Sequence, residues 1–156
     1  MIAVGITIGA FFFMEFVAWF SHKYVMHGFL WFLHKDHHVS TGHKLERNDF
    51  FALIFALPSV VFCVLGSVHG FDFRFWIGIG IALYGLVYFM LHDTLVHERT
   101  PLLRRIDNFY FRSIISAHND HHIGKKNFGF IFMFQPKHFK KEHHKPRRDA
   151  RLNSVR

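Results

Sequence analysis

The chain has 156 residues, of which 51% are hydrophobic and 19% aromatic, and its formal net charge at pH 7 is +8. That length suits a single domain, and it leaves no soluble domain large enough to cover the three long apolar stretches of the sequence. The composition therefore argues against a soluble protein, and the single Cys63 excludes an intramolecular disulfide.

The first predicted element is an apolar helix over about residues 2–20. A helix of this length spans about 28 Å, which is close to the hydrocarbon thickness of a bilayer. A secretory signal is the alternative, but the stretch lacks a positively charged start and ends in bulky residues rather than at a small-residue cleavage site. We therefore expect a retained membrane anchor. Its ionisable Glu15 is expected either to be functional or to pair with another polar group in the bundle.

A histidine pattern follows this anchor at once. His22 and His27 stand five residues apart, and an H-x-D-H-H run follows at 34–38. Side chains at i, i+3 and i+4 share one face of a helix, so the three histidines of that run can point together. A pair five residues apart is separated by about 140° on an ideal α-helix. We therefore expect the first pair either to straddle two metal ions or to lie in a locally distorted helix.

Two further apolar stretches, over about 50–68 and 75–91, are long enough to cross a bilayer as helices. In the third stretch Gly78, Gly80 and Gly85 permit close approach of a neighbouring helix. The same glycines would equally narrow a substrate channel or serve a homodimer. Together the stretches predict an all-α membrane protein with about three transmembrane helices, plus interfacial or cytoplasmic helices that carry the histidines.

The third stretch is followed by a second copy of the histidine pattern. His92 and His97 again stand five apart, and H-x-D-H-H recurs at 118–122. Two copies of one pattern are hard to explain except as metal ligands. Ten histidines exceed the roughly four ligands of a closed zinc site, whereas two ions would share them and keep an exchangeable position suited to redox chemistry with dioxygen. The predicted ligands are His22, His27, His34, His37, His38, His92, His97, His118, His121 and His122.

Three carboxylates stand next to these histidines in the sequence, namely Asp36, Asp93 and Asp120. A carboxylate in that place can accept a ring N–H of a ligand histidine and so fix its tautomer and orientation. Direct ligation of the metal and a plain solvated carboxylate are the alternatives for each of them.

The distribution of basic residues predicts the topology. With three spans, 18 of the 19 Lys and Arg residues fall on one side of the membrane, which the positive-inside tendency places in the cytoplasm, with the N-terminus outside. All ten motif histidines land on that same side, although they were not used in the argument. His69 falls on the opposite side, where we expect a polar loop residue rather than a ligand.

The segment after the second pair is amphipathic. Over 102–115 apolar residues recur near helical spacing with arginines between them, which predicts a helix lying on the membrane surface. We divide the chain into a membrane domain over 1–135 and a basic cytoplasmic tail over 136–156. Ten Lys and Arg residues between Lys125 and Arg156 would attract anionic lipid or dock an acidic electron donor. Nucleic acid is not an expected partner.

Several of these segments resemble a known family. The matching runs are HKYVMHG (22–28), HKDHH (34–38), HDTLVHER (92–99), AHNDHH (117–122) and NFGF (127–130). They resemble the bacterial β-carotene hydroxylases, which belong to the wider fatty acid hydroxylase superfamily of membrane di-iron oxygenases. The resemblance covers about residues 15–135 and includes every motif histidine.

The resemblance implies that the ten motif histidines carry two iron ions. Imidazole clusters also bind zinc well, so zinc can replace iron in a purified sample. It implies hydroxylation of carbon 3 of the β-ionone ring with O2 and two electrons, which converts β-carotene through β-cryptoxanthin to zeaxanthin. No acid or base outside the metal set is demanded. We further expect a ferredoxin-type electron donor, docked through the basic tail, and a location in the inner membrane of a bacterium.

Two alternatives remain beside this interpretation. An enzyme of the same superfamily acting on fatty acids or sterols would use the same metal chemistry. A membrane metal-binding or transport protein would favour ligands distributed at the midplane of several spans, whereas the histidines here crowd outside one face.

Overall fold

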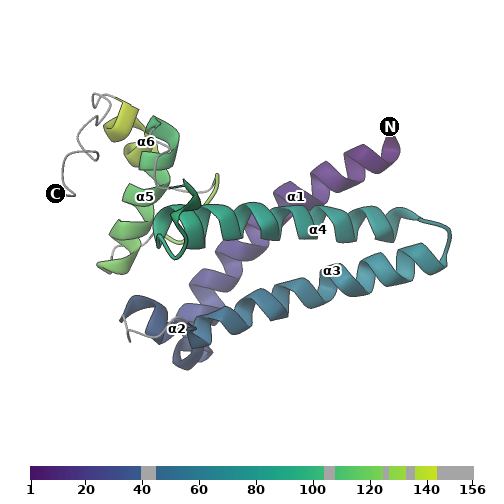
Figure 1. Ribbon diagram of the computed structural model, residues 1–156, viewed down its shortest axis with the longest axis horizontal. Coiled ribbons are helices and arrows are strands. Elements are labelled where there is room, and N and C mark those ends of the chain that lie inside the picture. Colours follow the sequence, from purple (N-terminus) through teal and green to yellow (C-terminus); the bar gives the residue numbers. More distant parts are fainter. Residues whose placement is uncertain (40–44, 104–107, 125–126, 133–135, 144–156) are drawn as a thin grey trace. The chain divides into compact units, whose positions relative to one another are not determined.

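The computed structural model describes residues 1–39, 45–103, 108–124, 127–132 and 136–143. Every regular element within these ranges is helical (Figure 1). The chain forms two compact units, Met1–Phe89 and Met90–Arg156. The predicted all-α class is therefore confirmed for the part of the chain that the structure describes.

The first unit contains three long helices, α1 (Ile2–Phe20), α3 (Phe50–Val68) and α4 (Phe73–Phe89). Helices α1 and α3 coincide with the first two predicted apolar stretches, and α4 begins and ends two residues before the third. Among the described residues, three helical segments are long and apolar enough to cross a membrane, and these are Ile2–Phe29, Arg47–Val68 and Phe73–Val96. The sequence-based prediction of three spans is therefore confirmed.

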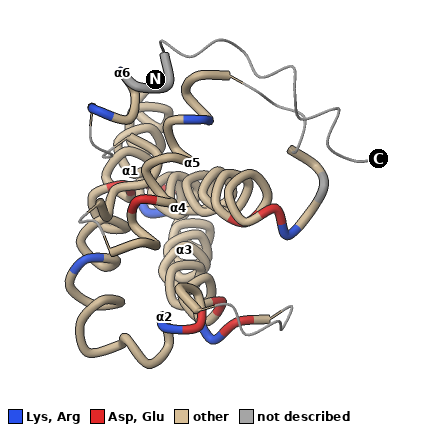
Figure 2. Tube along the Cα trace, turned by 90° about the vertical axis from the view of Figure 1, so that its left-hand side faces the viewer, with Lys and Arg blue, Asp and Glu red and all other residues tan. Residues whose placement is uncertain are grey.

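The side chains of these helices are distributed as a lipid environment requires. No Lys, Arg, Asp or Glu occurs over residues 50–68 or 75–89, and the coils of α3 and α4 are drawn almost entirely in tan (Figure 2). Large apolar residues such as Leu57, Val60 and Leu83 are exposed, whereas the polar Ser59 and the ionisable Glu15 are buried. Polar groups in a bilayer must find partners inside the protein, so this inverted pattern fits helices that face lipid.

Helices α3 and α4 form an antiparallel hairpin (Figure 1). A Cβ atom added at Gly78 would lie 2.6 Å from the sulfur of Cys63, so glycine is what lets the two backbones approach. The hydroxyl of Ser59 donates to the carbonyl oxygen of Gly78 at 2.8 Å. The hairpin is thus held by a small-residue contact and by an interhelical hydrogen bond.

Helix α1 packs against α4 in the same manner. A Cβ at Gly80 would lie 2.5 Å from the carbonyl oxygen of Thr7, whereas a Cβ at Gly85 would meet nothing within 4 Å. One turn further along α4, the hydroxyl of Tyr84 donates to Glu15 Oε2 at 2.8 Å. Of the two roles expected for Glu15, the structure therefore shows pairing with a polar group of a neighbouring helix.

The second unit contains η3 (Met90–Val96), η4 (Pro101–Leu103), α5 (Phe109–His122) and α6 (Pro136–His143). The single amphipathic helix predicted over 102–115 does not have those bounds. The structure has a short 3-10 turn at η4, and α5 starts at Phe109 because the side chain of Asn108 accepts the backbone N–H of Phe111 at 2.9 Å. Residues 104–107 lie outside the described ranges.

Helix α6 lies in the segment predicted as a basic tail, and it packs against α5. His138 of α6 is 2% exposed, and its Nε2 lies 3.7 Å from Asp120 Oδ2. The hydroxyl of Ser116 lies 3.4 Å from the Nδ1 atom of the same ring. The basic residues from 144 onward, for which lipid attraction was predicted, lie outside the described residues.

Candidate metal centre

Both histidine pairs spaced by five residues lie in a π-helical segment or at its end. His22 and His27 lie within η1 (Ser21–Phe29), which continues from α1. His92 lies in η3, which ends at Val96, directly before His97. Backbone hydrogen bonds in a π-helix run over five residues instead of four, so side chains five apart come to the same face. The ring centroids are 5.1 Å apart in the first pair and 4.6 Å apart in the second. The local distortion expected from the spacing is therefore present in both copies.

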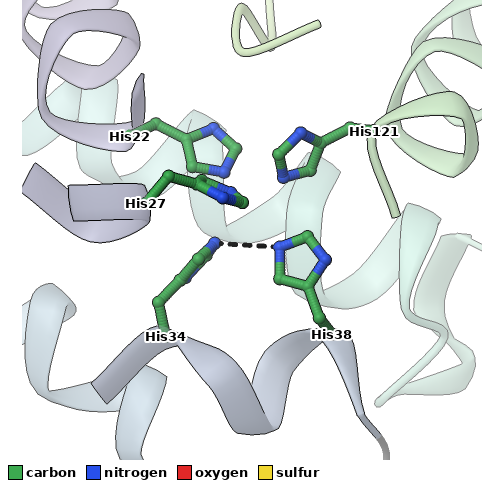
Figure 3. A group of neighbouring side chains, drawn as sticks. All are labelled: His22, His27, His34, His38 and His121. Carbon is green, nitrogen blue, oxygen red and sulfur yellow. Dashed lines mark hydrogen bonds between the residues drawn. The ribbon is translucent and has the colours of Figure 1, made fainter. Parts of the chain in front are cut away.

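The first unit gathers four motif histidines, which we call the first cluster (His22, His27, His34 and His38). They come from η1 and from α2 (Trp31–His38), and the helical path between these elements kinks at Gly28. One ring nitrogen of each lies within 4.8 Å of those of the other three. Figure 3 shows these rings facing a common space, with His34 Nε2 and His38 Nε2 at 3.2 Å.

In the second unit, a second cluster (His97, His118 and His122) comes from the residue that follows η3 and from α5. One ring nitrogen of each again lies within 4.8 Å of the others. His118 Nε2 lies 3.0 Å from His97 Nε2 and 2.8 Å from His122 Nε2. The ring of His92 adjoins this cluster, with its centroid 4.9 Å from that of His118.

The donor chemistry of both clusters fits a metal cation. A neutral imidazole offers one N–H and one lone pair, so three Nε2 atoms that converge on one another cannot all be satisfied as N–H···N pairs. A cation placed among them accepts every lone pair. Nitrogen-only donor sets of this type suit iron, zinc, copper and nickel.

His97 is held in the form that binds metal. Burial, followed by the neighbouring His92 and His122, lowers the pKa of His97 to about 3. Its imidazole is therefore neutral at physiological pH, as metal ligation requires.

The middle histidine of each H-x-D-H-H run lies on the same helix as cluster members and is buried. The Nδ1 atom of His37 lies 3.2 Å from Glu46 Oε2. The ring of His121 contacts that of Phe128, with centroids 5.4 Å apart, and that of His122, at 5.8 Å. In both runs it is the outer histidines, at i and i+4, that bring ring nitrogens together within one unit.

The three motif carboxylates differ in what they contact. Asp93 Oδ2 lies 3.4 Å from His92 Nδ1, which is the arrangement expected of an acceptor that orients a ligand, and Asp93 Oδ1 accepts from Arg99 at 2.9 Å. Asp36 accepts the backbone N–H of Arg47 at 2.6 Å. Asp120 faces His138, as described for α6. Orientation of a ring N–H is thus supported directly for Asp93.

Sequence reasoning missed two residues that contact the first copy of the motif. The side-chain oxygen of Asn48 lies 2.6 Å from His34 Nδ1, and Glu46 faces His37. Both come from the polar turn around η2 (Arg47–Asp49), immediately before α3. The sequence feature that could have indicated them is a short polar segment between a histidine-bearing helix and a membrane span.

Two polar residues outside the motifs lie where no ligand was expected. His69 is at the exposed end of α3, and its Nδ1 donates to the carbonyl oxygen of Leu65 at 2.8 Å. This agrees with its predicted role as a polar loop residue. Glu15 is engaged with Tyr84, as described above.

Comparison with known proteins gives a consistent family assignment. The sequence profile of the fatty acid hydroxylase family matches residues 7–141. A β-carotene hydroxylase of Pantoea ananas is 40% identical over 124 residues, which cover 76% of this chain and 70% of the relative. One of Pseudescherichia vulneris is 37% identical over 147 residues, covering 88% of this chain and 83% of the relative. One of Paracoccus sp. (strain PC1) is 39% identical over 125 residues, or 76% of each chain. No solved structure matches the chain.

Proposed function

Because the chain belongs to the fatty acid hydroxylase family, we propose that it is a membrane oxygenase that hydroxylates carbon 3 of the β-ionone ring of carotenoids. The observation that carries this function is the pair of imidazole clusters, each formed at a π-helical segment that ends a candidate membrane span. The relatives named as β-carotene hydroxylases supply the substrate class. The reaction takes β-carotene through β-cryptoxanthin to zeaxanthin.

The ten motif histidines would hold two iron ions, and zinc would occupy the same nitrogen donors in a purified sample that has lost iron. When bound, the iron supplies the two-electron activation of O2, so that one oxygen atom enters a ring C–H bond and the other leaves as water. The protein keeps the ligand nitrogens neutral, as the lowered pKa of His97 illustrates. It also fixes ring orientation, as Asp93 does at His92. No acid or base outside the metal set is needed.

The membrane helices suit a long apolar substrate. The exposed apolar faces of α1, α3 and α4 keep the enzyme in the bilayer, where a long apolar polyene dissolves. The first cluster is formed where α1 ends and shortly before α3 begins, so a metal held there would lie at the end of the spans rather than at their middle. A ring held at that level would leave the rest of the carotenoid among the lipid chains.

We propose the inner membrane of a bacterium as the location, with the histidines and the C-terminus in the cytoplasm and the N-terminus outside. The asymmetry of Lys and Arg supports this orientation. A ferredoxin-type protein would supply electrons, with the basic segment over 136–156 contacting either the donor or anionic lipid beyond the membrane domain over 1–135. The exposed Gly85 leaves room on α4 for a second copy of the chain.

The test is pigment analysis in bacteria that accumulate β-carotene and express this chain. We expect mono- and dihydroxylated pigments, and their loss in His121→Ala with membrane insertion unchanged. His69→Ala, at the far end of α3, is the matched control and should retain full conversion. Unchanged pigment from an iron-loaded, membrane-inserted wild-type protein supplied with an electron donor would overturn the carotenoid assignment and favour acyl or sterol substrates.

A further inference from the structure

We propose that Asn48 and Glu46 are positioning residues of the metal site, which hold Nδ1–H of His34 and His37 and so present Nε2 of each ring as the donor atom. Neither residue belongs to a histidine motif. The inference rests on the metal-binding part of the proposed function, not on the identity of the substrate.

The contact between Asn48 and His34 determines a tautomer. The amide oxygen of Asn48 lies 2.6 Å from His34 Nδ1, and an amide oxygen accepts but does not donate. The hydrogen must therefore reside on Nδ1. A neutral imidazole carries only one such hydrogen, so Nε2 keeps its lone pair, and it is Nε2 that faces His38 within the first cluster. His34 is 3% exposed, which keeps water from competing for Nδ1.

Glu46 acts in the same way on the neighbouring motif histidine. Its Oε2 lies 3.2 Å from His37 Nδ1, and His37 is 7% exposed. An ionised carboxylate is acceptor-only, so this contact also favours the hydrogen on Nδ1. A negatively charged acceptor further increases the basicity of the nitrogen opposite, which strengthens it as a metal ligand.

The turn that carries both residues is tied to the ligand helix and closed on itself. Asp36, the aspartate of the first H-x-D-H-H run, accepts the backbone N–H of Arg47 at 2.6 Å. Within the turn, Asp49 Oδ2 accepts the backbone N–H of Glu46 at 3.0 Å. Helix α2 therefore receives contacts from this turn at positions 34, 36 and 37. This gives the motif aspartate a role: it anchors the segment that orients two of the motif histidines.

The second unit uses the same principle with a different residue. Asp93 Oδ2 faces His92 Nδ1, so three buried motif histidines have an oxygen acceptor at Nδ1. In each case the nitrogen left for a metal is Nε2. Loss of such an outer contact typically costs roughly 10–100-fold in metal affinity or activity.

The first measurement is the tautomer of His34 and His37 in the metal-free, full-length protein in lipid nanodiscs. Histidine ring 15N spectra distinguish the two tautomers, and His34→Gln and His37→Gln assign the signals. We expect the hydrogen on Nδ1 of both rings. An Nε2–H tautomer at His34 in the wild-type protein would overturn the proposal without reference to any variant.

The second measurement is the affinity for Co(II), used as a spectroscopic stand-in for iron, in three Asn48 variants. Asn48→Leu removes the acceptor at similar size and should weaken binding roughly 10–100-fold. Asn48→Asp keeps an oxygen acceptor and should bind within about threefold of the wild type. Asn48→Ala replaces the leucine variant if that protein does not insert. A leucine variant, or its alanine replacement, that binds Co(II) as tightly as the wild type and the aspartate variant, with the wild-type tautomer retained, would contradict a positioning role.

These readouts separate the inference from the proposed function. Neither uses a carotenoid, so a wild-type protein that fails to hydroxylate pigment yet shows the expected tautomers and the aspartate rescue would leave the positioning role standing. Full pigment conversion by the wild-type protein, together with unaltered metal affinity in Asn48→Leu, would support the proposed function and contradict the positioning role.

Discussion

The backbone N–H of His97 donates to the carbonyl oxygen of His92 at 3.0 Å, a hydrogen bond that closes over five residues instead of four. On an ideal α-helix these side chains would be separated by about 140°, but their ring centroids are 4.6 Å apart. The same arrangement recurs at His22 and His27. A wider helical turn beside a membrane span is therefore what converts an H-x4-H spacing into a pair of ligands on one face.

The spacing can be tested by exchanging His22 with Lys23, which preserves composition and shortens the interval to His27 by one residue. The moved imidazole rotates by about 100° around the helix and leaves the first cluster, so we expect loss of bound iron and of hydroxylated pigment. Iron per protein, measured by elemental analysis after purification, is the readout. Retention of full iron content would show that the π-helical register is not needed.

Lys23→Ala is the control for that exchange. The ammonium of Lys23 lies 5.0 Å from the ring centroid of Trp19 and 4.7 Å from that of Tyr24, a contact worth about 0.5–1 kcal/mol at an exposed site. Its removal should lower thermal stability slightly and leave iron content unchanged.

The second cluster is centred on His118, whose Nε2 faces both His97 and His122. His118→Ala removes the nitrogen that the other two share, so we expect loss of iron and of product. His138→Ala, which alters a buried histidine of α6, should retain iron while lowering the melting temperature. Equal iron content in the two variants would contradict the separation of ligand and packing histidines.

The lowered pKa of His97 predicts a pH dependence of the metal-free protein. Its pKa falls from the usual 6.5 to about 3, first because of burial and then because of His92 and His122. As the pH drops through this window, the unfolded chain takes up a proton at this residue and the folded chain does not, so the free energy of unfolding decreases. Thermal melts at pH 7.5 and 5.0 should show a smaller drop in His97→Gln than in the wild type. An equal drop in both would contradict the assignment.

The membrane helices were accessible from sequence because each is an uninterrupted apolar run. The bounds of α1 and α3 match the predicted stretches, and α4 both begins and ends two residues earlier than predicted. The repeat of the histidine pattern identified the site, and the five-residue spacing indicated a distortion. A π-helix was not foreseen as its form, because a spacing states that side chains must meet but not how the backbone accommodates them.

Contacts between two segments that do not belong to one helix could not be predicted from the sequence pattern. Asn48 and Glu46 contact histidines of α2, and no periodicity of the sequence connects these two segments. The start of α5 was misplaced because apolar spacing over 102–115 outweighed the capping signal of Asn108, which ends the preceding segment. The contacts of polar residues close to a motif therefore cannot be predicted from the sequence pattern and are known only from the folded chain.

Two glycines of α4 offer a matched test of helix packing. A Cβ at Gly80 would lie 2.5 Å from the backbone oxygen of Thr7 and 2.6 Å from the Cβ of Ala10, so α1 must move to accept alanine there. Overpacking of this kind costs about 1–3 kcal/mol. Gly85, five residues along the same helix, faces open space, so Gly85→Ala should not destabilise the protein and would raise its stability by about 0.5–1 kcal/mol at most. Because α1 continues into η1, displacement of α1 in Gly80→Ala should also lower iron content, as measured beside unfolding in detergent. A Gly80→Ala protein as stable and as iron-rich as Gly85→Ala would contradict the close approach of α1 and α4.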